Sequence, residues 1–262
     1  MKEYLVNDWK LNNSQASRIL STSRGGKYYK KKMPFKDAPV CNAIKEATKG
    51  NRRGRVKVIK LVQRKHPQYS SSRIRRVYEQ GGFILNRKIK KRVIKHVSNP
   101  IDVVVKPNEQ WAIDCMSDAL TSGRRVRTLN MIDHFNRVCV GIAASHNMPA
   151  VRIIEHLERA IEKYGKPKGI RTDNGPEFTS KRFQLWLHNK GIEWIKIPKG
   201  RPDQNAIIER FNRSYREEIL DANLFEDTRQ MQQLTDEWLN YYNNHWPHQS
   251  LNFKTSMEYA AA

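Results

Sequence analysis

The chain has 262 residues, 38% of them hydrophobic, which is enough for one large domain or for a core of about 150 residues with smaller attachments, and which excludes a mini-protein. Its 49 Lys and Arg residues against 26 Asp and Glu residues give a net charge of +23, of which residues 1–100, with 27 basic and 5 acidic residues, carry +22. Positive charge this concentrated favours a polyanionic partner: nucleic acid is the commonest one, and a lipid surface is the other candidate.

Residues 1–60 are predicted to be a basic N-terminal segment and linker. A short helix is expected from Ser14 to Leu20. From residue 24 to 60, Gly, Pro and basic residues are dense and apolar residues are few. This composition favours a segment that becomes ordered only when it meets phosphates.

Residues 61–100 are predicted to form a helix-turn-helix-like DNA-binding region. A first helix is expected from Ser71 or Ser72 to Gln80, where two glycines end it, and a second over about 86–96. The second helix of such a unit can enter a major groove, although a pair of ordinary solvated helices is the alternative. The basic residues of the second helix that we expect to contact DNA are Arg87, Lys88, Lys91 and Arg92.

Residues 101–220 are predicted to form an α/β core. Segments rich in β-branched and aromatic residues, separated by turn-forming residues, predict strands. The expected strands are 110–116, 125–133, 138–145, 169–173 and 192–198, and the expected helices are 149–164, 179–190 and about 203–220. Three hairpin-linked strands, followed by strands that alternate with helices, indicate a mixed sheet with flanking helices. Residues 221–262 are predicted to be a C-terminal helical extension.

Three acidic residues in this core stand where a carboxylate needs an explanation. Asp114 lies in the middle of a strand, where an unpaired carboxylate is costly to bury. Asp173 lies where a strand ends, which is where α/β sheets usually bind ligands, but it also belongs to a turn-forming Asp-Asn-Gly sequence. Glu209 lies one or two turns into the last helix, where a surface pair with Arg213 or Arg216, four and seven residues later, is the alternative. Glu177 is expected to have a turn or strand-end role rather than to bind a metal.

Three carboxylates that converge would repel one another unless cations neutralised them. Hard divalent ions such as Mg²⁺ prefer oxygen ligands, and two such ions about 4 Å apart hold the attacking and leaving oxygens of an in-line phosphoryl displacement. We therefore expect Asp114, Asp173 and Glu209 to be catalytic and to bind two Mg²⁺ or Mn²⁺ ions.

The cysteines and the apolar segments suggest the compartment. Cys41, Cys115 and Cys139 are odd in number and form no C-x-x-C pair, so we expect reduced thiols and no disulfide framework. The N-terminus lacks the apolar segment of a signal peptide, and no apolar run reaches the roughly 18 residues of a membrane span. A cytoplasmic protein with no membrane partner is expected.

Five motifs in order give residues 62–262 a specific resemblance to a known family. The motifs are QWAIDCMSDAL, RTLNMIDHFNR, GKPKGIRTDNGPEFTS, RPDQNAIIERFNRSYREEIL and WLNYYNNHWPHQSL. They resemble DDE-type insertion-sequence transposases, most closely the orfB type of insertion sequence family three, whose catalytic core is similar to retroviral integrase. The resemblance implies a ribonuclease-H-like core, places Asp114, Asp173 and Glu209 at the three acidic positions, and matches residues 66–96 to the preceding helix-turn-helix region.

The resemblance also bears on other positions. Arg216 matches a basic residue that the family carries seven residues after the glutamate. The residues near the last helix that we expect to contact DNA phosphates are Lys199, Arg201, Arg213 and Arg216. Two departures stand out: Trp246 replaces an Arg, which is expected to weaken a phosphate contact, and serines at 70–72 replace a Gly-containing stretch.

The function implied is DNA transposition in a bacterium by a nucleoid-associated enzyme. It would cut double-stranded DNA at the ends of a mobile element and join the exposed 3′-hydroxyl to target DNA. The implied partners are element ends, target DNA, further copies of the chain on DNA and, through a fusion, the product of an upstream reading frame. The alternatives are a catalytically silent DNA-binding repressor of transposition and a metal-dependent nuclease that does not join.

Overall fold

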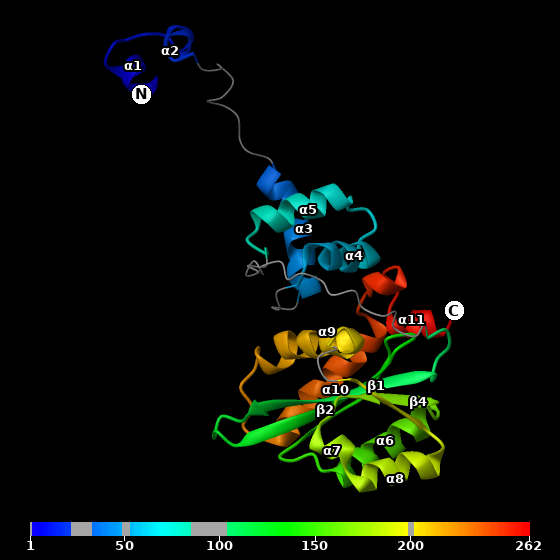
Figure 1. Cartoon of the computed structure of the whole chain (residues 1–262). Coiled ribbons are helices and arrows are strands. Elements are labelled where there is room, and N and C mark those ends of the chain that lie inside the picture. The colour runs from blue at the N-terminus through cyan, green and yellow to red at the C-terminus, as the bar shows by residue number, and fades with distance from the viewer. Residues whose placement is uncertain (1, 22–32, 49–52, 85–103, 199–201) are drawn as a thin grey trace. The chain divides into compact units, whose positions relative to one another are not determined.

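A computed structural model describes residues 2–21, 33–48, 53–84, 104–198 and 202–262 (Figure 1). The chain divides into two compact units, residues 1–84 and 85–262. None of the helices in the described ranges is long and apolar enough to span a membrane.

The first unit begins with two short helices, α1 (Lys2–Asn7) and α2 (Asn13–Ile19). Helix α2 is the predicted short helix, and Asn12 caps it. The Asn12 side chain accepts hydrogen bonds from the backbone N–H groups of Ser14 and Gln15, and the Gln15 side chain accepts one from the Asn12 N–H. This reciprocal capping box fixes the first turn.

Three further helices form a bundle, α3 (Met33–Thr48), α4 (Arg55–Lys65) and α5 (Ser71–Gln80). Residues 33–48 and 55–60, which were predicted to be linker, are helical. Val40, Ala43 and Ile44 recur at helical spacing and are buried, and the charged side chains between them are long enough to keep their heads in water. The buried core of the bundle is Val40, Ala43, Ile44, Val58, Val62, Ile74, Val77 and Tyr78.

Helix α5 is the predicted helix that ends at Gln80. Its cap is Ser70 rather than either of the next two serines, because the Ser70 hydroxyl accepts a hydrogen bond from the Arg73 N–H at 3.3 Å. Helix α4, the turn 66–70 and α5 thus follow one another in helix-turn-helix order. The predicted helix 86–96 lies outside the described residues.

The second unit is built on one five-stranded sheet, and all five strands were predicted. The strands are β1 (Gln110–Ala119), β2 (Arg125–Asp133), β3 (Cys139–Ser145), β4 (Gly169–Thr172) and β5 (Glu193–Lys196). Their order is β3-β2-β1-β4-β5; β1, β2 and β3 are antiparallel, whereas β4 is parallel to β1 and β5 to β4. This is the ribonuclease-H-like mixed sheet that the resemblance implied.

Helices cover both faces of the sheet (Figure 1). On one face lie α6 (Ala150–Tyr164), α7 (Pro176–Thr179) and α8 (Lys181–Lys190), and on the other lie α9 (Ala206–Tyr215) and α10 (Thr228–Asn244). Each face of the sheet has its own hydrophobic core, and alternate residues of β1 point into one or the other. Trp111 and Ile113 pack in the core with α6 and α8, whereas Ala112 packs in the core with α9. By the same alternation Asp114 points toward α9.

The α9 helix follows a 3₁₀ turn at Pro202–Asn205 and continues as a π-helical stretch, Arg216–Leu220. The segment 221–262 is helical as predicted, with α10, a short 3₁₀ turn at Gln249–Leu251 and α11 (Ser256–Ala260). It is also part of the core.

Side chains of α10 pair with the backbone of the edge strand β3. The amide of Asn243 pairs with the N–H and the C=O of Cys139, and the amide of Gln232 accepts from the Ala144 N–H and donates to the Ile142 C=O. Helix α10 thereby covers an edge that would otherwise be open to pairing with another strand.

Trp246 is 5% exposed and packs against Trp238, Tyr241 and Tyr242. The residue that replaces the family's Arg therefore fills the aromatic core between α10 and the sheet.

Candidate active site

Asp114 is held in place by a chain of two side-chain amides. It lies on β1 directly opposite Asn130 of β2. The Nδ2 of Asn212, on α9, donates to Asp114 Oδ2 at 2.6 Å, and the Oδ1 of Asn212 accepts from Asn130 Nδ2 at 2.7 Å. Asn130 and Asn212 are both buried. Because Asn212 lies one helical turn after Glu209, these bonds tie the helix that carries Glu209 to the strand that carries Asp114.

The predicted acidic residues act on one another through their charges. Burial raises the pKa of Asp114 to about 6, and the negative charges of Asp173 and Glu209 add to the shift. The hydrogen bonds from the Cys115 N–H and from Asn212 act in the opposite direction. The fold thus brings residues separated by 59 and 95 positions within electrostatic reach of one carboxylate.

Asp173 lies in a tight loop after β4. Its Oδ1 accepts a hydrogen bond from the Gly175 N–H at 3.0 Å. A Cβ atom on Gly175 would lie 3.1 Å both from Asp173 Oδ1 and from Glu177 Oε1, so any larger residue here would require these two carboxylates to shift. Both acidic side chains therefore lie against the same glycine.

An arginine on β2, Arg127, neutralises the carboxylate of Glu177. Arg127 Nη2 lies 2.5 Å from Glu177 Oε1, and the Glu177 side chain is only 7% exposed. Arg127 also interacts electrostatically with Asp173. Glu177, expected to serve a turn, is thus one half of an ion pair that joins the Asp173 loop to β2.

Helix α9 places Glu209 in its first turn, exposed to solvent, with Arg213 exposed one turn later. Among the described residues no ion pair joins Glu209 to Arg213. Arg216 is held against the sheet, because its Nη2 donates to the Ser117 C=O at 2.9 Å and its Nη1 lies 3.7 Å from Asp221 Oδ1. The other predicted DNA contacts lie outside the described residues; they are Arg87, Lys88, Lys91, Arg92, Lys199 and Arg201.

All three residues are carboxylates, the oxygen ligands that a hard divalent cation prefers, and the pKa of Asp114, raised first by burial, is raised further by the charges of Asp173 and Glu209, a repulsion that a cation would relieve. Within the described ranges, no three His, Cys, Asp or Glu side chains are close enough together to ligate one ion. The three carboxylates therefore interact electrostatically, but in the described ranges they are not close enough together to ligate one ion.

Sequence reasoning missed Asn130, Asn212 and Arg127. Only Asn212 carried a signal, its position one helical turn beyond Glu209 on a helix that was already predicted. The other two are ordinary polar residues of a strand until the partner element is in place.

Comparison with known proteins agrees with this architecture. Residues 104–202 and residues 190–255 match two family models that are each described as an integrase core domain. The chain is 32% identical over 252 residues to an insertion element IS407 protein of Burkholderia multivorans, covering 96% of this chain and 91% of that protein. An insertion element IS476 protein of Xanthomonas euvesicatoria is 31% identical over 96% of this chain and 73% of its own length.

Two further matches have lower sequence identity. The transposase for insertion sequence element IS904 of Lactococcus lactis is 27% identical over 62% of this chain and 64% of its own length. The catalytic core domain of the HTLV-2 integrase, solved in complex with magnesium, aligns with 59% of this chain and 97% of its own, at 21% identity and a TM-score of 0.48.

A ribonuclease-H-like sheet with integrase-core sequence across its strands and covering helices defines a protein of the transposase and integrase class, whose general chemistry is polynucleotidyl transfer. Within that class, this chain belongs to the DDE transposases of insertion sequences. Its function is transposition.

Proposed function

We propose that this transposase cuts the ends of its mobile element and joins the freed 3′-hydroxyl to target DNA at one site, in which Asp114, Asp173 and Glu209 hold two Mg²⁺ or Mn²⁺ ions. The observation that carries the proposal is the raised pKa of Asp114, to which the charges of the other two carboxylates contribute. When bound, the ions supply activation of the attacking oxygen and stabilisation of the leaving oxygen.

The chain's own residues position the acidic groups. Asn212 fixes the orientation of the Asp114 carboxylate, and a pKa of about 6 leaves that carboxylate mostly ionised at neutral pH. Gly175 and the Arg127–Glu177 pair set the loop that carries Asp173. Glu209 lies on α9, and the hydrogen bonds that join Asn130, Asn212 and Asp114 hold α9 in position relative to β1.

Binding to DNA is assigned mainly to residues 1–100, where almost all of the net charge lies. Arg213 and Arg216, together with Lys199 and Arg201, are proposed to contact phosphates near the cut. The chain is proposed to work in the cytoplasm, at the nucleoid, as a homo-oligomer on DNA, because two element ends have to be held together. Whether an upstream reading frame is fused to it can be read from the flanking DNA.

The test is incubation of the purified full-length protein with labelled element-end DNA and Mg²⁺ or Mn²⁺. Nicks at the 3′ ends of the element and joined products are expected. Asp173→Asn should abolish both while leaving the affinity for DNA within a few fold, because affinity resides mainly in the basic half. Binding without either product would indicate a repressor, and nicks without joining would indicate a nuclease.

A further inference from the structure

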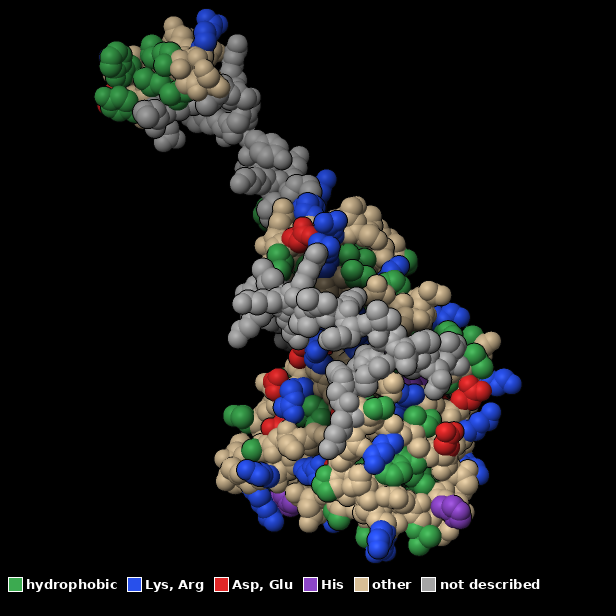
Figure 2. All heavy atoms as spheres, in the orientation of Figure 1, with side chains coloured by type: hydrophobic (Ala, Val, Ile, Leu, Met, Phe, Trp, Pro, Cys, Tyr) green, Lys and Arg blue, Asp and Glu red, His purple; other side chains and the backbone are tan. Residues whose placement is uncertain are grey.

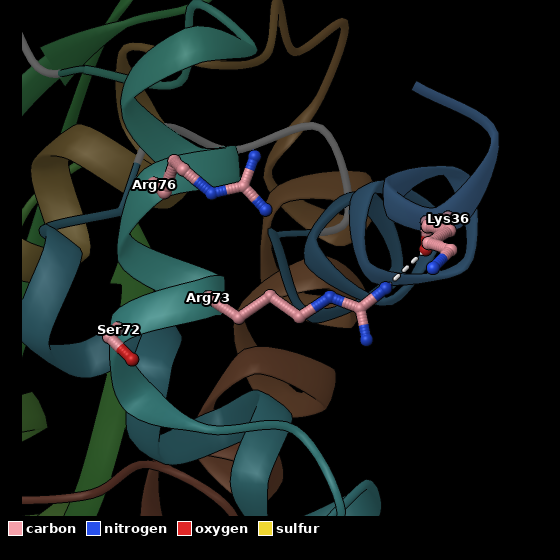
Figure 3. A pocket seen from close by; sticks show the side chains of 4 residues that line it. All are labelled: Lys36, Ser72, Arg73 and Arg76. Carbon is pink, nitrogen blue, oxygen red and sulfur yellow. Dashed lines mark hydrogen bonds between the residues drawn. The ribbon is translucent and has the colours of Figure 1, made fainter. Parts of the chain in front are cut away.

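A cavity of about 550 Å³ lies on the three-helix bundle, between α3 and α5. Lys36 of α3 and Ser72, Arg73 and Arg76 of α5 line it. Figure 3 shows the two arginines leaving α5 on the same side and extending toward the helix that carries Lys36. All four of these lining residues belong to the first unit.

One carboxylate organises both guanidinium groups. Arg76 pairs with Asp37 through Nη1 to Oδ2 at 2.7 Å and Nη2 to Oδ1 at 3.0 Å, and Arg73 Nε lies 3.3 Å from the same Oδ1. Arg73 also donates through Nη2 to the Lys36 carbonyl, the bond drawn in Figure 3. The Asp37 side chain is 12% exposed, whereas each arginine side chain is 35% exposed.

The charges at the cavity do not balance. Three cations meet one carboxylate, so the site carries a net +2. Each guanidinium has five N–H donors: Arg73 makes two hydrogen bonds, to Asp37 and to the Lys36 carbonyl, and Arg76 makes three, two to Asp37 and one of 3.4 Å to Gln80 Oε1. The Lys36 side chain is exposed to solvent. Figure 2 shows Lys and Arg side chains exposed on this part of the chain. Arginine forks beside a lysine and a serine hydroxyl match the chemistry of a phosphate group.

The place of the cavity in the bundle favours duplex DNA as the source of that phosphate. Helix α5 is the second helix of the α4–turn–α5 unit, and its exposed residues are Ser71, Ser72, Arg75, Glu79 and Gln80. A helix of this kind reads base edges while residues that flank it hold the backbone. Lys36, Arg73 and Arg76 flank α5 on the side of α3.

We propose that the cavity lined by Lys36, Arg73 and Arg76 binds a phosphate of the DNA backbone, and that Asp37 competes with this phosphate for the two arginines. This inference rests on the proposed function in one respect, that the transposase acts on duplex DNA. It adds a contact site in the first unit and an acidic residue that lowers the affinity of that site.

The test is the salt dependence of DNA binding by the full-length protein. Lys36→Gln is the informative variant, since its side chain is exposed and its loss leaves the Asp37 ion pairs intact. Loss of one phosphate contact should reduce the slope of log K against log salt by about 0.9. Lys45→Gln is the matched control: Lys45 is also exposed on α3 but lies nine residues on, half a turn around the helix, and should leave the slope unchanged.

Asp37→Asn tests the competition. Removing one unit of negative charge a few ångströms from the bound phosphate should tighten binding by about fivefold at low salt. Circular dichroism checks that the bundle is still folded. Tighter binding supports the competition, and unchanged or weaker binding by a folded variant refutes it.

The outcomes separate this inference from the proposed function. If the wild-type protein cuts and joins DNA but Lys36→Gln and Lys45→Gln have the same slope as wild type, the phosphate site is refuted and the transposase function stands. If Lys36→Gln weakens binding of inorganic phosphate alone and leaves the DNA slope unchanged, the assignment to DNA is refuted. Failure of the wild-type protein to cut would instead count against the proposed function.

Discussion

Asp114→Asn is expected to stabilise the metal-free protein at neutral pH. Burial and the charges of Asp173 and Glu209 raise the pKa of Asp114 from its ordinary value of 3.8 to about 6. The folded state therefore binds this proton more tightly than the unfolded state does, so the free energy of unfolding falls as the pH rises from about 4 to about 6 and stays lower above that. A shift of about two pKa units corresponds to about 3 kcal/mol. Asparagine has nearly the same shape and carries no such penalty.

Urea unfolding in the presence of a chelator, followed by tryptophan fluorescence, measures this effect. The buried Trp111, Trp238 and Trp246 report on the second unit. At pH 7 the variant should exceed wild type by up to about 3 kcal/mol in free energy of unfolding, and the gap should narrow as the pH is lowered toward 4. Glu237→Gln is the control: it lies at an exposed position on α10 and should change the free energy of unfolding by less than about 0.5 kcal/mol.

Adding Mg²⁺ should make wild type more stable than Asp114→Asn, the reverse of the metal-free order. Only a protein that binds the ion gains stability from it, so wild type should be stabilised in proportion to the logarithm of the Mg²⁺ concentration and Asp114→Asn should not. A variant that is no more stable than wild type at pH 7 without metal would refute the reasoning. Ionised Asp114 would then not destabilise the folded state, and the charges of Asp173 and Glu209 would have no cost to add to.

Three further changes probe the residues that surround the acidic site. Asn212→Ala removes a donor to Asp114 and should move the acidic limb of the pH–rate profile for DNA cleavage upward by about 1 to 2 pH units, because a hydrogen bond to a charged group contributes about 1.5–3 kcal/mol; an unmoved limb would contradict this. Glu177→Gln should lower the cleavage rate, and the reversed pair Arg127→Glu with Glu177→Arg should recover part of the loss; a double variant no better than either single one would argue against the ion pair. Trp246→Ala should lower the free energy of unfolding by about 3–5 kcal/mol in urea titrations, and a cost below about 1 kcal/mol would show that the aromatic cluster does not depend on it.

The sheet and most of its helices could be predicted from the sequence because their signals are local. Strand β2 has the predicted bounds, and β1 is longer than predicted by three residues at its C-terminal end. There Ser117 and Ala119 are exposed, so the pattern had changed from buried to alternating while the strand continued. The end of α5 at Gln80 was likewise readable from the two glycines that follow it.

The helix α3 was not predicted because its signal is weak. Pro39 lies inside it, and its apolar positions are separated by Lys and Asp residues, which is also the composition of a basic linker. The segment is helical because Val40 and Ile44 are buried against α4 and α5. Tertiary burial outweighs local propensity in such a helix.

The acidic residues could be proposed from their places on strand and helix, but the groups that position them could not. Asn212 contacts Asp114 across 98 positions and Asn130 across 82, and Arg127 contacts Glu177 across 50. No periodicity links residues so far apart.

Composition and local patterns determined, for this transposase, the basic first half, the five strands and the positions of the three acidic residues. Only the tertiary structure decided that Asn130 and Asn212 orient Asp114, that Arg127 neutralises Glu177 beside Asp173, and that Asp37 lies between two arginines of α5. The physical reason is that strand and helix formation depend on neighbours in sequence, whereas hydrogen bonds and ion pairs between elements depend on register and packing, which exist only after the sheet and its helices have come together.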